Sequence, residues 1–244
     1  MAATTRADWA EHRLRTAILT GELEPGERIR IEQLAAAWHL SPTPLREAVR
    51  SLAHTGLVDL TPQRGATVAG LSPEEIASIY ELRLLLEPRA LRLSLHRRDW
   101  AWRADVEAAW LALGRAWGED RRAPAHVEPA HTAFHEALAA GCGNRELLRL
   151  TRRLAAQSMR VLLLAIAQDR IEGPTLADHA ELYEACVEGD VDDAMRVAIV
   201  HVGRPMAARI GGDAVRAIGA RIAEAGGGDP LLPEVLDTLT RAAR

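Results

Sequence analysis

The spacing of apolar and polar residues over the first seventy positions predicts three short helices followed by a hairpin. Residues 9–19 carry apolar side chains on one helical face, and residues 31–38 form a second, shorter amphipathic segment. A third helix begins at about residue 42 and runs to about residue 54. Residues 57–60 and 66–68 alternate like two strands around a turn rich in Pro and Gly. Helix, helix, helix and hairpin in this order predict a winged helix-turn-helix over residues 1–70.

Helical periodicity continues almost to the end of the chain, with breaks at short segments rich in Gly, Pro and Asp. No further strand-like alternation stands out, so we expect residues 71–210 to form an all-α bundle of about six or seven helices. Residues 211–244 contain one or two more helices, split by a glycine-rich break at 226–230. The predicted fold class is therefore mainly α, with the only strands in the N-terminal domain.

Charge and composition narrow the class of partner. The net charge is −4, which argues against a general polyanion binder, but residues 1–70 carry equal numbers of arginines and carboxylates. All basic residues are arginines, so every cationic contact uses a guanidinium fork. Cys142 and Cys186 are expected to be free thiols in a reducing compartment. With no signal peptide and no apolar run long enough to span a bilayer, we expect a cytoplasmic protein without membrane contact.

The third helix has the character of a DNA-recognition helix. Ser41 lies at its N-cap and a proline follows at its first position, which is a strong signal for a helix start. In a helix-turn-helix the first residues of this helix meet base edges, so Ser41, Thr43 and Arg46 are candidates for contacts with operator DNA. Arg50 shares a face with Arg46. It can contact DNA, pair with Glu47 or simply face solvent.

The predicted hairpin supplies a second candidate contact. Arg64 and Gly65 fall at the tip of the wing, where Gly permits a tight turn and Arg can enter the minor groove or contact a phosphate.

The N-terminal segments resemble the GntR family of bacterial regulators. The resemblance covers residues 8–70 and rests on the sequence Gly-Glu-Leu-Glu-Pro-Gly-Glu at 21–27, the 41–48 run and the hairpin that follows Gly56. It implies binding to a double-stranded DNA operator. Pro42 and Glu32 occupy positions where the family usually or often has Arg, and both positions commonly contact the operator. This departure puts the family's usual operator sequence in doubt, although it leaves DNA binding itself in place.

The candidate chemistry of the second domain lies in its histidines. His131 and His135 are four residues apart on one predicted helix, a spacing that lets one metal ion bind both rings. A histidine pair alone is weak evidence, because most histidines make ordinary hydrogen bonds.

Residues 73–208 resemble the FadR-type ligand-binding domain known as FCD. The similar segments are residues 80–88, Phe134-His135 with Gly-Asn at 143–144, and the stretch from His179 to His201. Most members of that family hold a divalent metal on one Asp and three His, and a carboxylate effector completes the coordination. The resemblance places His135, His179 and His201 on the three His positions, whereas His131 stands where the family has Asp.

Four imidazoles form a neutral, softer ligand set than an oxygen-rich one, which favours zinc or nickel. The full charge of the ion then remains to attract an anionic effector. Arg83 lies in the family's Tyr-x-x-Arg pattern and is a candidate to bind an effector carboxylate, although it can equally pair with Glu87. A degenerate site in which the imidazoles bind the effector without metal is the alternative.

These patterns predict a homodimeric, ligand-responsive transcriptional regulator, because two DNA-binding heads match a palindromic operator. A metalloenzyme with four-His zinc is the second hypothesis. No carboxylate stands in a motif such as His-Glu-x-x-His to act as general base, which argues against it.

Overall fold

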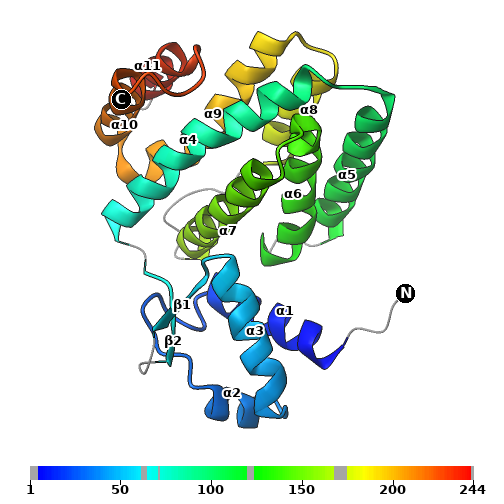
Figure 1. Cartoon of the computed structure of the whole chain (residues 1–244), viewed down its shortest axis with the longest axis vertical. Helices are drawn as coiled ribbons and strands as arrows, with labels where there is room; N and C mark the ends of the chain where they lie inside the picture. The colour runs from blue at the N-terminus through cyan, green and yellow to red at the C-terminus, as the bar shows by residue number, and fades with distance from the viewer. Residues whose placement is uncertain (1–4, 62–64, 71, 120–123, 168–174, 243–244) are drawn as a thin grey trace.

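The computed structural model describes residues 5–61, 65–70, 72–119, 124–167 and 175–242. Figure 1 shows a small N-terminal part joined by a short linker to a larger, all-helical part. The predicted fold class is confirmed: three helices and a hairpin precede a helical bundle. None of the described helices is long and apolar enough to cross a membrane.

The N-terminal part is built from α1 (Arg6–Leu19), α2 (Ile31–Ala37), α3 (Pro42–His54), β1 (Val58–Thr61) and β2 (Gly65–Val68). The two strands are antiparallel, with the first residue of β1 opposite the last residue of β2. The apolar faces of α1 and α3 pack against each other and against the base of the hairpin. The largest fully buried side chains of this core are Leu14, Ile18, Leu45, Leu52 and Leu57.

The linker leads into the first helix of the larger part. The Ser72 hydroxyl accepts a hydrogen bond from the Glu75 amide, and the Glu75 carboxylate accepts one from the Ser72 amide. This capping box fixes the start of α4 four residues after the wing ends.

Six helices form the body of the larger part: α4 (Pro73–Leu95), α5 (Trp100–Glu119), α6 (Pro124–Ala139), α7 (Arg145–Ala167), α8 (Leu176–Val187) and α9 (Val191–Ile210). One apolar core joins α5, α6, α8 and α9, and it contains the buried Phe134, Leu182 and Met195. Both cysteines are free and buried. The core brings α6, α8 and α9 together, and these three helices carry the candidate metal ligands.

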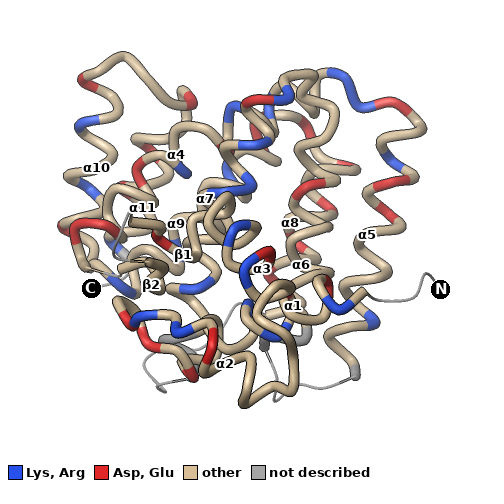
Figure 2. Tube along the Cα trace, turned by 60° about the horizontal axis from the view of Figure 1, so that its bottom comes forward, with Lys and Arg blue, Asp and Glu red and all other residues tan. Residues whose placement is uncertain are grey.

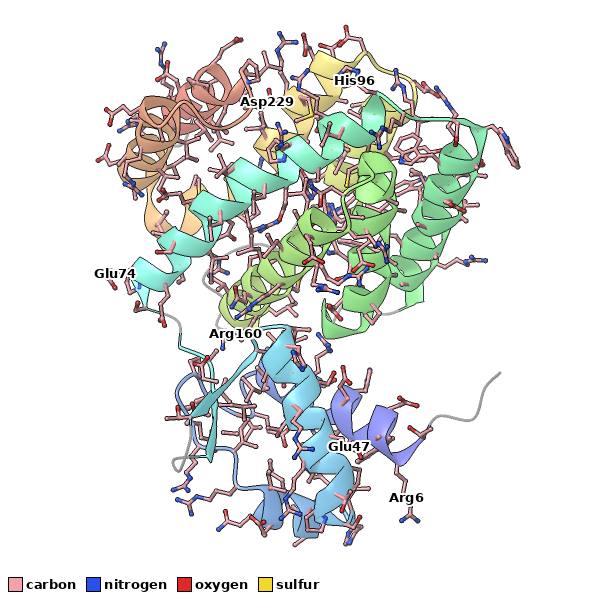
Figure 3. The ribbon with its side chains drawn as sticks, in the orientation of Figure 1. Arg6, Glu47, Glu74, His96, Arg160 and Asp229 are labelled. Carbon is pink, nitrogen blue, oxygen red and sulfur yellow. The ribbon has the colours of Figure 1, made fainter. Side chains whose placement is uncertain are left out.

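The C-terminal segment is a helical hairpin, α10 (Gly212–Glu224) and α11 (Leu232–Ala242), that covers α9 and the first half of α4. Asp229, in the turn between the two helices, accepts hydrogen bonds at 2.6 and 3.0 Å from Arg92 of α4. The same guanidinium also binds Asp192 at 2.9 Å. Figure 3 shows Asp229 at this junction, remote from the N-terminal part. The predicted C-terminal extension therefore stabilises the bundle from the side opposite the wing.

The two parts of the molecule meet at the C-terminal half of α7. The Arg160 guanidinium is buried and donates hydrogen bonds to the carbonyls of Ala69 and Gly70 in the linker (Figure 3). The Gln157 side-chain amide donates to the carbonyl of Gly56, just beyond α3, at 3.4 Å. Gly56 has a φ of +75°, and a Cβ at this position would lie 2.3 Å from the Gln157 amide nitrogen. The positive φ favours glycine at this position, and a Cβ here would in addition displace the Gln157 side chain.

Candidate metal centre and nucleic-acid interface

The exposed face of α3 carries the residues predicted to contact DNA. Ser41, Thr43, Arg46 and Arg50 are all exposed, whereas most apolar residues of the helix, Leu52 among them, are buried in the core. Ser41 is at the N-cap position, but its hydroxyl makes no capping hydrogen bond. This leaves the hydroxyl available to a phosphate or a base. Figure 2 shows basic positions on α3 and beside the wing, interspersed with acidic ones.

Arg46 is held by a carboxylate from the neighbouring helix. Its guanidinium lies 3.0 Å from Glu32 of α2, and both side chains are at least half exposed. An exposed pair of this kind contributes little to stability. It does place a negative charge beside the exposed face of α3. Arg50 makes no ion pair with Glu47 or any other carboxylate among the described residues.

The wing includes a third extended segment that the sequence pattern did not reveal. Ile29 donates its backbone N–H to the Ala66 carbonyl at 2.9 Å, and Arg28 forms a bridge with Thr67. The Arg28 guanidinium lies beside Gly65, whose φ of +90° requires glycine. Alternation of buried Ile29 with exposed arginines on either side was the available signal. Arg64, the predicted wing-tip contact, lies outside the described residues.

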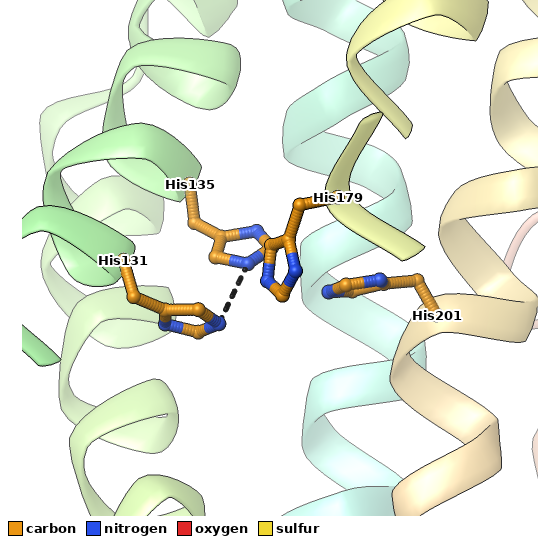
Figure 4. Close-up of side chains that lie close together, drawn as sticks. All are labelled: His131, His135, His179 and His201. Carbon is orange, nitrogen blue, oxygen red and sulfur yellow. Dashed lines mark hydrogen bonds between the residues drawn. The ribbon is translucent and has the colours of Figure 1, made fainter. Parts of the chain in front are cut away.

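The four predicted histidines converge on one point in the helical part. His131 and His135 project from the same face of α6, His179 from α8 and His201 from α9, and Figure 4 shows their rings pointing toward one another. Nε2 of His131 lies 3.2 Å from Nε2 of His135. If one ring nitrogen is taken from each of the four histidines, these four nitrogens all lie within 4.8 Å of one another.

Two ring nitrogens of this cluster are buried without a hydrogen-bond partner. Nδ1 of His179 donates to the Thr175 carbonyl at 2.8 Å, which leaves its Nε2 with a free lone pair that no described residue satisfies. Nδ1 of His131 is likewise buried and unpaired. A backbone carbonyl that fixes one nitrogen of a histidine commonly orients the other nitrogen toward a metal.

Burial is the largest cause of the altered acid–base behaviour of the cluster. It lowers the pKa of His131 and of His135 well below the usual value, and neighbouring imidazoles and Arg83 lower them further. Burial also lowers the pKa of His201, to about 3, and that of His179. The rings are therefore neutral at pH 7, which is the protonation state that metal binding requires.

The donor set fits a transition-metal ion. In a tetrahedral site with metal–nitrogen distances of about 2.0–2.1 Å, two ligand nitrogens lie roughly 3.3 Å apart, close to the spacing of the α6 pair. The set is entirely nitrogen, neutral and partly unsatisfied in the protein. The four-His cluster can accordingly hold a metal ion, with small rotations of the rings that lie farther apart.

A cavity of about 460 Å³ opens from the cluster between α4, α6, α7 and α9, and His131, His135 and His201 line one part of it. Arg83 lines another part. Its guanidinium makes two hydrogen bonds to Glu87, at 2.6 and 3.1 Å, and one to the Ser158 hydroxyl at 2.6 Å. The ion pair considered from the sequence is therefore present. Arg83 still borders the cavity and has N–H groups beyond these three.

The contacts of α7 were not predicted from the sequence. Ser158 binds Arg83 in the cavity, while Gln157 and Arg160 bind the N-terminal part. The sequence offers one signal for Arg160, since it directly precedes the longest apolar run of the chain. Nothing in the sequence identifies which residues a buried arginine at that position would contact.

A winged helix-turn-helix joined to a helical bundle with a ligand cavity defines a class of DNA-binding regulators. The model for bacterial regulatory proteins of the gntR family matches residues 6–68, and that of the FCD domain matches residues 78–204. The chain belongs to the GntR family of transcriptional regulators, in the FadR-like group that carries an FCD domain. The family consists of regulators, so the metalloenzyme hypothesis is set aside.

Known relatives agree with this assignment. The chain is 29% identical to the transcriptional repressor GlaR of Escherichia coli (strain K12) over 199 residues, which cover 79% of this chain and 90% of GlaR. It is also 29% identical to a probable D-xylose utilization operon repressor of Paenarthrobacter nicotinovorans, over 76% of this chain and 80% of that protein. A putative GntR regulator from Rhodococcus has the same fold, with a TM-score of 0.61, 24% identity and coverage of 81% of this chain and 94% of its own.

The lowered pKa values predict how the metal-free protein responds to acid. Unfolded imidazoles take up protons near pH 6.5, whereas the folded cluster resists protonation, so the unfolded state binds more protons below that pH. Stability should therefore fall as the pH drops below about 6.5 and continue to fall toward the folded-state pKa, about 3 for His201. His201→Gln should reduce the number of protons taken up on unfolding by about one per chain. This number is obtained from the pH dependence of the free energy of urea unfolding between pH 4 and 7.

His96→Gln provides the matched control, because His96 is exposed at the end of α4 (Figure 3). Equal pH dependence in the wild type and His201→Gln would show that His201 titrates in the folded protein like an exposed histidine.

Proposed function

We propose that this regulator binds its operator as a homodimer, under the control of a small anionic effector bound beside a metal ion in the FCD domain. The observation that carries the proposal is the convergence of four neutral imidazoles at a cavity whose wall, α7, also contacts the DNA-binding domain.

In the proposed DNA complex, α3 enters the major groove. Ser41 and Thr43 contact phosphates or bases at its start, and Arg46 and Arg50 reach base edges or phosphates one turn apart. The wing, with Arg64 and Gly65, contacts the minor groove or the backbone. Exposure of the α3 residues supports this assignment. Two such heads in a dimer read the two half-sites of a palindrome.

In the proposed effector site, His131, His135, His179 and His201 hold one divalent ion, with zinc or nickel favoured by the all-nitrogen ligand set. Four neutral ligands leave the charge of the ion uncompensated, so a carboxylate is the natural additional ligand. Arg83 is the second candidate anchor for that anion, because it lines the same cavity, where its guanidinium also contacts Glu87, Ser158 and Tyr80.

The link between the two sites runs through a single turn of α7. Ser158 contacts Arg83 inside the cavity, and Gln157 and Arg160 hold the end of α3 and the linker. An anion that draws Arg83 toward the metal would change its bond to Ser158 and so bias the position of α7. A shift of α7 would move the DNA-binding domain. An effector that binds one position of α7 more tightly than another would therefore change the spacing of the two DNA-binding domains in a dimer.

The metal assignment predicts about one divalent transition metal per chain in protein purified without chelator. Removing the metal should lower the melting temperature, and a free metal concentration of 100 times the dissociation constant should stabilise the fold by about 2.7 kcal/mol. His179→Gln should abolish this effect and His96→Gln should not. His131→Asp should still bind metal but with a greater preference for manganese. Elemental analysis measures the metal content, and thermal melts measure the change in melting temperature. A melting temperature that does not change when zinc or nickel is added would refute a metal site.

The DNA assignment predicts that Arg46→Ala weakens binding to the native operator. If Arg46 contacts a guanine bidentately, the loss should be about 1–3 kcal/mol, with relaxed preference at that base pair. Binding is measured by fluorescence anisotropy at fixed salt, with Arg149→Ala as control because Arg149 is an exposed residue in the first turn of α7. Unchanged affinity of Arg46→Ala across operator variants would exclude α3 as the reading helix.

The coupling through α7 predicts a transmitted effect of metal binding. In the wild type, saturating zinc should slow amide hydrogen exchange around residues 56 and 69–70, because it stabilises the helices against which α7 packs. Arg160→Met should retain zinc binding but lose most of this distant protection. Arg153→Met, an exposed position on the same helix, should behave like the wild type. Equal protection in Arg160→Met and the wild type would assign the coupling to another contact.

A further inference from the structure

The size of the cavity beside the histidine cluster is informative about what fills it. At about 460 Å³ it lies within the range of roughly 300–1,000 Å³ that is typical of pockets enclosing a drug-sized ligand. A two- or three-carbon acid that reached only the metal and Arg83 would leave most of this space empty. The effector therefore has a body that extends along the cavity, away from its anionic group.

The charged residues of the cavity allow for one anionic group. Those among the described lining residues are two arginines and three carboxylates: Arg83, Arg152, Glu87, Asp105 and Glu136. In the interior, Glu87 already neutralises Arg83, and nearer solvent Glu136 pairs with Arg152. Asp105 is exposed to solvent. Among the described lining residues, a divalent ion on four neutral imidazoles would then be the one cation of the interior without a carboxylate partner. A second carboxylate that extends along the cavity away from this ion would be buried against the apolar wall without a cationic partner, which is strongly unfavourable.

The hydroxyl groups of the cavity are largely committed to the protein. Ser158 donates to the Ala155 carbonyl at 3.0 Å and accepts from Arg83, and Thr151 donates to the Leu148 carbonyl at 3.1 Å. A polyhydroxylated acid would find few partners here, and each unpaired hydroxyl would disfavour its binding.

Apolar side chains make up most of the remaining wall. They come from α4, α6, α7 and α9 and include Leu91, Leu138, Leu148, Met159, Leu162 and Val202. Contact with this wall removes the hydrocarbon part of a ligand from water. The free energy of binding becomes more favourable in proportion to the apolar area that is buried.

We infer that the effector is a monocarboxylate with an apolar body, of the aromatic or medium-chain aliphatic class, and not a dicarboxylate or a sugar acid. This inference rests on the proposed function, since it places the carboxylate beside the metal and Arg83. The apolar body then lies along the wall formed by α7, the helix that contacts the DNA-binding domain.

The test uses zinc-loaded full-length protein and titration calorimetry with acetate, butyrate, hexanoate, octanoate, phenylacetate, succinate and gluconate. Affinity should rise along the aliphatic series by roughly fourfold for each methylene until the cavity is filled. Octanoate and phenylacetate should bind at least tenfold more tightly than acetate, succinate and gluconate. Metal content is measured again after each titration, so that extraction of zinc is not mistaken for weak binding. Tighter binding of succinate or gluconate than of octanoate overturns the inference.

Matched variants of α7 test the location of the apolar body. Ala155 lines the cavity, and its neighbour Ala156 does not. Ala155→Leu should reduce octanoate affinity at least tenfold while acetate affinity and zinc content change less than about twofold, and Ala156→Leu should bind octanoate like the wild type. Equal octanoate affinity in both variants overturns the placement.

Failure of the inference is distinguishable from failure of the proposed function. Binding of all the acids with no preference for apolar bodies overturns the inference alone. Zinc-loaded protein that binds none of the acids overturns the effector site, and the inference with it. If the protein takes up no metal, the same series on metal-free protein decides the question, since a preference for octanoate supports the inference and its absence overturns it.

Discussion

The structure of the FCD domain is organised around four converging imidazoles, two of whose ring nitrogens are buried without a hydrogen-bond partner. α6, α8 and α9 bring the rings together, and Thr175 fixes the orientation of His179 through its Nδ1. Burial keeps all four rings neutral. Buried nitrogens with lone pairs and no partner destabilise a fold unless another group binds them, and a metal ion would satisfy several at once. Because the four imidazoles are neutral, they would not compensate the charge of a bound metal ion, and that charge would attract an anion. Metal binding and effector binding would in this way be connected.

The second constraint is that one helix borders both functional regions. Within four residues of α7, Ser158 contacts the cavity while Gln157 and Arg160 contact the DNA-binding domain. The opposite side of the bundle is stabilised by the α10–α11 hairpin through Arg92 and Asp229.

Most of the fold follows from local signals in the sequence. The Ser41-Pro42 start and the Gly56 end bound α3, and the Ser72 capping box begins α4 close to the boundary expected between residues 70 and 71. The bridge between Arg28 and Thr67 was missed because the alternation of burial around Ile29 extends over only three residues, which is too short to predict a strand. The structure brings together the four histidines that the resemblance to FCD domains singled out, whereas their spacing alone supported only the His131–His135 pair. Metal binding by these histidines, and the DNA contacts of α3, stay predictions.

The sequence by itself determined the order of elements, the two-domain organisation and the identities of the candidate ligands, because helix caps, periodicity and family motifs are local or inherited patterns. Tertiary structure alone decided which groups share an environment. It paired Arg46 with Glu32, buried Arg160 against the linker, and formed an apolar cavity beside the histidines. These contacts join residues distant in the chain. Their distances depend on how whole helices pack, and no local pattern encodes that.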